Sequence, residues 1–277
     1  MIIQHHHNLN SNEAPFKLVL FKPKGALSAY VQCIWFASVT ATDNRGLYSG
    51  EQSVKRWLAG DGCGGILFSL NPLFCLNQKI YRTNILLLPV SKHSQKIELL
   101  PGCQLAGIRF QPGVSFSLFG SLFDKPIMVT EQNDSNQLNE LFFALTTCIG
   151  FSSVILKIYQ WCNQQVAFEA LTPKKVINAI QYFQNSYLTN DLTTTNLPLS
   201  LRQIERQFSK RIGLTPVQFK RLLRVKNCWS QLKFNPQVDL SELALQCGFS
   251  DQAHMINEFK RFAEITPGRL SQLLLRR

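Results

Sequence analysis

One stretch decides the fold of the C-terminal third: Glu242-Leu-Ala-Leu-Gln-Cys-Gly-Phe-Ser-Asp-Gln-Ala-His-Met-Ile-Asn-Glu-Phe-Lys-Arg261. It indicates a helix, a tight turn and a second helix. Gly248 supplies the turn, Ser250 is placed to cap the second helix, and Asp251 adds a favourable charge to its first turn. Apolar residues recur at helical spacing, namely Leu243, Ala244, Cys247, Met255, Ile256, Phe259 and Phe262. A helix-turn-helix is predicted.

The same pattern occurs a second time upstream, at a fixed offset. Phe208 stands 51 residues before Phe259, and Leu214-Thr-Pro216 stands at the same distance before Ile265-Thr-Pro267. Between the two units, residues 217–233 have helical spacing and predict one long connecting helix. Pro216 lies in its first turn, where proline is tolerated.

At these residues the chain resembles the AraC/XylS family of bacterial transcription regulators. The resemblance covers about residues 173–274 and rests on Ala244-x-x-x-Gly248-Phe-Ser-Asp-Gln-x-His254, followed by Phe-Lys-Arg and Thr-Pro. It implies two helix-turn-helix units, double-stranded DNA as partner, and transcription activation with RNA polymerase as a second partner. Repression would use the same DNA contacts.

The chain departs from the family pattern at two places. Residues 193–198 lack the small residue and the turn glycine usual in the first unit, which predicts a short or frayed first helix there. Glu264 stands where family members mostly have glycine, which leaves the chain reversal before Ile265 open.

Positive charge is concentrated in the C-terminal part. Residues 172–277 hold 16 Lys and Arg against 7 Asp and Glu, whereas residues 1–171 hold 13 against 10. A basic surface attracts DNA phosphates. A role in solubility alone would explain the high pI, near 9.5, but not the concentration of positive charge in the C-terminal part.

A helical wheel of the first unit separates an apolar side from a polar side. The polar side, expected to face the major groove, holds Arg202, Gln203, Arg206 and Lys210. Arginine can donate two hydrogen bonds to guanine, worth about 1–3 kcal/mol of discrimination per pair. Any amphipathic surface helix also turns charges outward, but the tandem repeat favours DNA reading.

The second unit presents fewer charged groups. Ala253 occupies the position of Arg202, and Asn257 occupies that of Arg206. Asn257 can hydrogen-bond adenine, while Ala253 can at most contact a thymine methyl group. The residues expected to point outward are Ala253, His254, Asn257 and Arg261.

Three polar residues near the start of this helix have alternative roles. His254 is expected to position the helix or meet phosphate, and not to bind metal, because only Asp251 and Glu258 stand at helical spacing from it. Gln252 falls on the packed side of the wheel, yet it could reach DNA from the first turn. The amides that follow Ser250 could hold a phosphate.

Cysteine usage and targeting signals limit the function classes. The cysteines at positions 33, 63, 75, 103, 148, 162, 228 and 247 show no Cys-x-x-Cys spacing and are expected to be reduced core residues, with no metal and no cofactor. A DNA-repair enzyme with a similar domain would need a cysteine cluster for zinc and methyl transfer. No signal peptide opens the chain, and the apolar run 85–89 is too short to cross a bilayer, so a cytoplasmic protein off the membrane is expected.

Residues 16–110 contain short apolar runs separated by Gly, Pro and Asn, typical of an antiparallel sheet or barrel. The runs are 31–36, 66–68, 85–88, 97–100 and 105–110, and helical spacing follows at 114–123 and 136–162. The segments 23–35, Asp61-Gly62 and 105–113 resemble the cupin-like sensor domains of AraC-type regulators, which implies ligand sensing or dimerisation. A metal-dependent cupin enzyme would need several histidines, whereas His93 stands alone beyond the N-terminal tail.

Candidate effector-binding residues in this part are Trp35, Trp57 and Arg109. The Arg109 fork suits a carboxylate or phosphate, but an internal salt bridge or simple exposure is the stronger expectation. The tryptophans line a pocket or fill the core. The His5-His6-His7 tract is expected to be a disordered tail and not a metal chelator. The helical stretch 136–162 packs on the barrel, contacts a second copy, or does both.

The sequence therefore predicts an α+β chain. A cupin-like β-barrel sensor with trailing helices is expected at 1–165, a linker at 166–172, and an AraC-type DNA-binding domain of two helix-turn-helix units joined by a long helix at 173–277. Sequence-specific transcription regulation is the predicted function, with a small-molecule effector and a homodimer left open. The alternative is an architectural DNA-binding protein that needs no ligand.

Overall fold

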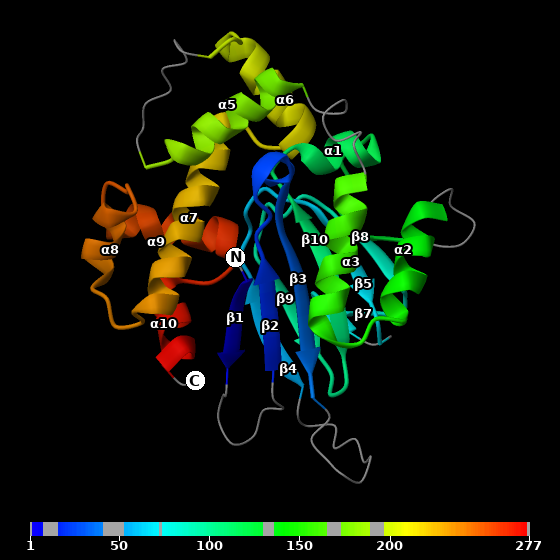
Figure 1. The fold of residues 1–277 in the computed structure, drawn as a ribbon. Helices are drawn as coiled ribbons and strands as arrows, with labels where there is room; N and C mark the ends of the chain where they lie inside the picture. The colour runs from blue at the N-terminus through cyan, green and yellow to red at the C-terminus, as the bar shows by residue number, and fades with distance from the viewer. Residues whose placement is uncertain are drawn as a thin grey trace.

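The computed structural model describes residues 16–40, 53–71, 74–129, 136–164, 173–188 and 197–275, and the backbone of residues 2–7. An N-terminal part of two sheets and several helices is followed by a C-terminal part made of helices (Figure 1). Within these ranges, no helix is long and apolar enough to cross a membrane. The predicted linker at 166–172 lies outside the described residues.

The strands form two antiparallel sheets. They are β1 Ile2–His7, β2 Phe16–Phe21, β3 Val31–Val39, β4 Val54–Leu58, β5 Gly65–Ser69, β6 Phe74–Leu76, β7 Lys79–Tyr81, β8 Ile85–Leu88, β9 Gln95–Leu99, β10 Gln104–Phe110 and β11 Ile127–Met128. The large sheet has the order β1-β2-β3-β10-β5-β8-β11 and the small sheet the order β4-β9-β6-β7. All five predicted strands are confirmed. The histidine tract is not a free tail, because β1 pairs with β2 along its whole length.

Side chains of the central strand β10 alternate between two cores. Ala106, Ile108 and Phe110 face a cluster shared with the helices, while Leu105 faces the small sheet. Buried side chains from both sheets pack the space between them, including Phe16, Leu67, Phe74, Tyr81, Leu86 and Ile97. Because protein cores are close-packed, a ligand between the sheets would have to displace some of these groups.

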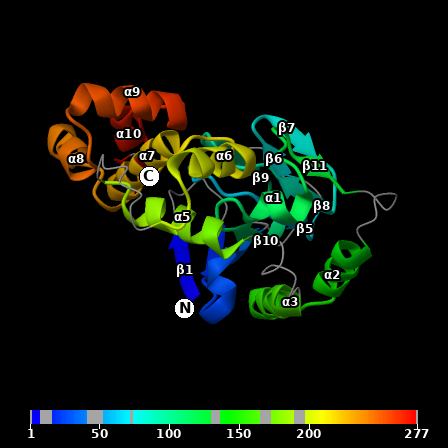
Figure 2. The same cartoon turned by 90° about the horizontal axis from the view of Figure 1, so that it is seen from above.

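Helices of the N-terminal part cover the outer face of the large sheet. They are α1 Val114–Phe119, α2 Asn136–Thr146 and α3 Gly150–Gln164, preceded by the short 3-10 helix Gly25–Ala29. The stretch 136–162, predicted as one helical region, is two helices, because the backbone leaves helical geometry at 147–149. Their apolar sides pack on the sheet through Phe142 and Ile158, and they lie on the flank away from the helices of residues 240–275 (Figure 2).

The C-terminal helices confirm the tandem repeat. They are α5 Lys174–Asn185, α6 Leu201–Ile212, α7 Pro216–Phe234, α8 Leu240–Gln246, α9 Gln252–Ala263 and α10 Pro267–Leu275. The starts of α6 and α9 are 51 residues apart, as are those of α7 and α10. The predicted connecting helix is α7. Most of the expected short helix at 193–198 lies outside the described residues. The described residues 197–199 form bends.

Helix α7 forms the centre of the C-terminal core. Phe219 packs edge-on against Phe208 of α6, and Trp229 stacks on Phe259 of α9 with ring centroids 5.9 Å apart. Each buried aromatic side chain contributes about 1.5–3 kcal/mol through its removal from water. The same core includes Val90, and Trp57 of β4 packs against it, so the N-terminal part is docked on the C-terminal helices.

Candidate DNA-binding surface

The first recognition helix, α6, begins with a complete capping box. The Ser200 hydroxyl accepts from the Gln203 backbone N–H at 3.4 Å, and Gln203 Oε1 accepts from the Ser200 backbone N–H at 2.9 Å. Gln203 therefore has a structural role that the helical wheel did not show. Arg202 and Arg206 are exposed, as predicted.

The other end of α6 contacts the N-terminal part. Arg211 Nη1 donates to the Ser117 hydroxyl of α1, and the Arg211 guanidinium lies 5.3 Å from the centre of the Phe116 ring. Lys210 Nζ lies 5.4 Å from the centre of the same ring. Lys210 is exposed, but its cation–π contact draws it towards α1, at the edge of the candidate DNA surface.

The second recognition helix, α9, is capped one residue later than predicted. Asp251 is the N-cap, and its Oδ1 accepts from the His254 backbone N–H at 2.7 Å. Ser250 instead donates to Asp251 Oδ2 at 2.9 Å. The prediction of Ser250 as the cap was wrong because the Asp251 carboxylate reaches the third amide of the helix. This hydrogen bond lowers the pKa of Asp251, and the ionised carboxylate occupies an amide that was expected to hold a phosphate.

Side chains near the start of α9 connect it to α8. The His254 ring lies edge-on to Phe249, and its Nδ1 lies 3.0 Å from the Ser250 hydroxyl, which gives it a positioning role. Gln252 is half-buried, and its Oε1 accepts from the Ser241 hydroxyl at 3.0 Å. An open hollow of about 610 Å³ lies here, lined by Ser241, Leu245, Ser250, Asp251, Gln252, Ala253 and Ile256.

The outward face of α9 is exposed as predicted, and its C-terminal end is held by the N-terminal part. Ala253, Asn257 and Arg261 are exposed. The sequence did not decide whether the chain reverses before Ile265, because Glu264 replaces the usual glycine. The reversal does form, with Glu264 itself in the left-handed conformation at φ 57°. Next to it, the Phe262 carbonyl accepts from the backbone N–H of Ser94 at 2.8 Å.

A second contact from the same loop also reaches the last turn of α9. His93 Nδ1 lies 3.1 Å from the Arg261 carbonyl oxygen, and the imidazole stacks on the Phe262 ring with centroids 6.3 Å apart. The loop between β8 and β9 therefore satisfies helix-end carbonyls that would otherwise face solvent. Both recognition helices are thus attached to the N-terminal part at their C-terminal ends.

A buried carboxylate joins the two parts of the molecule. Asp61 forms two hydrogen bonds with the Arg109 guanidinium, one of them from Nε at 3.2 Å, and Lys226 Nζ of α7 lies 3.3 Å from Asp61 Oδ2. Burial alone raises the pKa of Asp61, but the charges of Arg109 and Lys226 together lower it below its usual value. The adjacent Gly62 packs so closely that a Cβ there would lie 2.7 Å from the Phe219 ring.

Each candidate effector residue has contacts within the protein. Arg109 makes the internal salt bridge that was the stronger expectation. Trp35 lies against Gly107 of β10 and fills core, while Trp57 packs against Trp229 with ring centroids 6.2 Å apart. Within the described residues, no group of three His, Cys, Asp or Glu is arranged to hold a metal ion.

Comparison with known proteins agrees with the geometry of the C-terminal helices. Residues 194–272 match a family described as a helix-turn-helix domain. The C-terminal part of the chain carries a helix-turn-helix domain. Residues 20–125 match a second family, described as a domain of unknown function.

The curated relatives match this chain over part of its length. The HTH-type transcriptional activator RhaS of Yersinia pestis bv. Antiqua (strain Angola) is 26% identical over 114 residues, covering 40% of this chain and 41% of the relative. RhaS of Yersinia pseudotuberculosis serotype O:1b (strain IP 31758) is 25% identical over the same length and shares. The chain thus spans about two-fifths of these relatives. The structure of ToxT from Vibrio cholerae O395 has 15% identity and a TM-score of 0.44, covering 80% of this chain and 98% of that one.

Proposed function

We propose that the protein is a sequence-specific DNA-binding transcription regulator, and that α6 and α9 enter successive major-groove segments. The observation that carries this is the repeat itself. Two helices of equal length, 51 residues apart and tied to one connecting helix, both turn exposed polar faces outward. A structural surface helix would not need a matched copy at fixed spacing.

The two faces have different roles in this proposal. Arg202 and Arg206 read guanine edges, with the Gln203 amide beside them, and Lys210 contacts phosphate. On α9, Ala253 lies against a base, while Asn257 and Arg261 contribute mainly to affinity through contacts with the sugar-phosphate backbone. Ser250, Gln252 and His254 hold the start of α9 in place, since each has a partner within the domain.

Activation is the proposed output, with RNA polymerase as partner, because the curated relatives are named activators. We place the protein in the cytoplasm, where bacterial DNA is found, and assign it no enzymatic step. The domain boundaries that we propose are a sensor or dimerisation domain at 1–165, a linker at 166–172, and the DNA-binding domain at 173–277.

A ligand-independent architectural role is the second candidate, and one observation favours it. The space between the sheets is filled by side chains such as Phe74 and Tyr81, and Arg109 is paired with Asp61. An effector would have to bind elsewhere or displace these groups. A small molecule that binds the full chain and changes its DNA affinity would exclude this candidate.

Selection of bound sites from random DNA by the purified full-length protein tests the proposal. We expect one enriched motif with two contacted segments about 10 base pairs apart. An Arg202→Ala, Arg206→Ala double variant should lose preference in one segment, while Arg269→Ala should keep the motif. Arg269 is a matched control because it is an exposed arginine on α10, outside both recognition helices. Enrichment of no motif by the wild-type protein would refute the proposal.

A further inference from the structure

One loop of the N-terminal part contacts the C-terminal ends of both recognition helices. It joins β8 to β9, and three consecutive residues make the contacts. Lys92 packs on the turn after α6, where a Cβ on Gly213 would lie 2.7 Å from Lys92 Nζ. His93 Nδ1 lies 3.1 Å from the Arg261 carbonyl oxygen, and the Ser94 backbone N–H donates at 2.8 Å to the next carbonyl of α9. Since consecutive Cα atoms are about 3.8 Å apart, both helix ends are held against one segment about 8 Å long.

The loop is itself fixed to the segment that carries Asp61. The Ser91 backbone N–H donates to the Cys63 carbonyl at 2.9 Å. The Ser91 carbonyl accepts from the backbone N–H groups of Asp61 and Gly62, at 3.0 and 2.9 Å. Ser91 and Ser94 are buried, and hydrogen bonds made away from water are strong, so the loop has little freedom of its own. It therefore holds the helix ends in a fixed position relative to the sheets.

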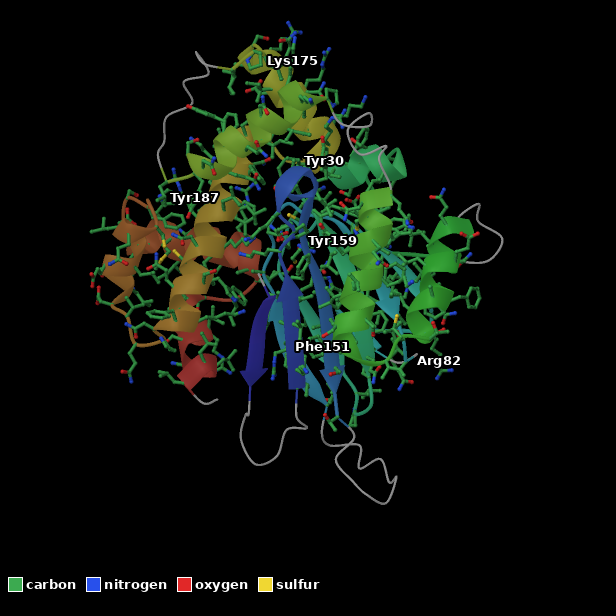
Figure 3. All side chains as sticks on the ribbon, viewed as in Figure 1. Tyr30, Arg82, Phe151, Tyr159, Lys175 and Tyr187 are labelled. Carbon is green, nitrogen blue, oxygen red and sulfur yellow. The ribbon has the colours of Figure 1, made fainter. Side chains whose placement is uncertain are left out.

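The turn between α6 and α7 is the joint that this loop controls. Helix α7 is held on more than one side. Trp229 stacks on α9, and Arg224 Nε donates at 2.8 Å to the carbonyl of Tyr187, which lies beside α7 (Figure 3). Helix α6 joins α7 through Gly213, which ends α6 in the left-handed conformation at φ 70°. Helical hydrogen bonding stops there, so the turn at Gly213 is where α6 can tilt against α7.

A small tilt at this turn moves the reading end of α6 by a large distance. Gly213 and Arg202 are 11 residues apart, which at 1.5 Å per residue is about 16 Å of helix. A tilt of about 10–20° at Gly213 therefore moves Arg202 by about 3–6 Å. One added base pair moves a DNA segment by about 3.4 Å along the duplex and rotates it by about a tenth of a turn. The two changes are of similar size, so the angle of α6 determines which DNA spacing fits.

We propose that Lys92, His93 and Ser94 form a brace that fixes the angle between α6 and α9, and through it the spacing between the two DNA segments that the protein accepts. The three residues are positioning residues, because they act on the recognition helices. This inference rests on the proposed DNA-binding function. It adds that the N-terminal part, and not α7 alone, sets the spacing.

The brace is compatible with bound DNA. In helix-turn-helix proteins, residues near the start of the recognition helix contact base edges. Arg202 and Ala253 lie at that end of their helices and are exposed, whereas the brace contacts the opposite ends. Lys92 also brings a positive charge to the C-terminal end of α6, where the helix dipole favours a cation. The docked N-terminal part can therefore stay in place while both helices read DNA.

Binding of the full-length protein to a set of DNA duplexes tests the brace. The duplexes carry the motif that the wild-type protein selects, with one base pair removed or added between its two segments. We expect the wild-type protein to prefer the selected spacing by about tenfold or more. The Lys92→Ala, His93→Ala double variant should show a preference of about threefold or less, because α6 can then tilt.

Two further variants serve as controls. Lys92→Arg combined with His93→Asn keeps a cation and a side-chain N–H donor, so it should retain the spacing preference. Lys125→Ala removes the charge of an exposed lysine in the same part of the chain and should retain the preference as well. The pair separates loss of the brace from loss of charge.

Two binding results would overturn the brace. One is a wild-type protein that binds its motif at all three spacings equally. The other is a double alanine variant that binds all spacings more weakly by the same factor, since the loop would then only stabilise the helix ends. A wild-type protein that selects no motif would instead refute the proposed function. Hydrogen exchange without DNA then tests the brace: the Ser94 amide should exchange about tenfold faster in the double alanine variant than in the wild type, and equal rates would overturn it.

Discussion

Replacing Asp61 by Asn should destabilise the docking of the two parts more than any single surface change. Asp61 is 5% exposed, and its carboxylate is the shared partner of Arg109 and Lys226. Asparagine keeps the side-chain oxygen that accepts from the Cys63 backbone N–H at 3.0 Å, so that bond need not be lost. What disappears is the negative charge between two cations.

The magnitude follows from the exposure of the two partners. The Arg109 side chain is 21% exposed, so its loss of an ion-pair partner resembles the breaking of a buried pair, which costs about 3–5 kcal/mol. The Lys226 side chain is 35% exposed and can turn to solvent, so its share is at most about 1 kcal/mol. We expect a total cost of about 3 kcal/mol for Asp61→Asn, and at most about 1 kcal/mol for the control Lys226→Met.

Urea unfolding at neutral pH, followed by tryptophan fluorescence, measures both variants, since Trp57 and Trp229 meet across the interface. The folded-state pKa of Asp61 is depressed, so its contribution is present above the unfolded pKa of about 4 and is lost as pH falls below it. The wild-type protein should therefore lose its advantage over Asp61→Asn in acid. A cost below about 1 kcal/mol at neutral pH, or one equal to that of Lys226→Met, would refute the reasoning.

Further predictions concern DNA reading and the turn after α9. Arg206→Ala should relax base preference at one position, by about 1–3 kcal/mol, while Asn257→Ala should mainly lower affinity overall. The DNA motifs selected by the two variants test this difference. A uniform loss of affinity for Arg206→Ala, with unchanged base preference, would show that this arginine contacts phosphate. Affinity should fall with salt, with a log–log slope of about 0.9 per neutralised phosphate, and salt-independent binding would contradict phosphate contacts. Glu264→Gly should raise stability by about 1 kcal/mol by relieving left-handed strain, whereas Glu264→Ala should not; equal melting temperatures would count against strain. Inserting about five base pairs between the two contacted segments should abolish specific binding, and retained affinity would show that α7 is not a rigid connector.

The sequence by itself determined the elements whose signals are local. Helices α6, α7 and α9 follow from apolar spacing over a few turns, because each helical hydrogen bond joins residues four apart. The repeat in residue type became a repeat in structure for the same reason. Local competition also explains the errors, since Ser250 and Asp251 are both good caps and only backbone geometry chooses between them.

Tertiary structure alone decided which distant groups meet. Lys226 and Asp61 are 165 residues apart, and His93 and Arg261 are 168 apart, so no periodic pattern connects them. Neighbours in a close-packed core are selected by shape and burial and not by separation along the chain.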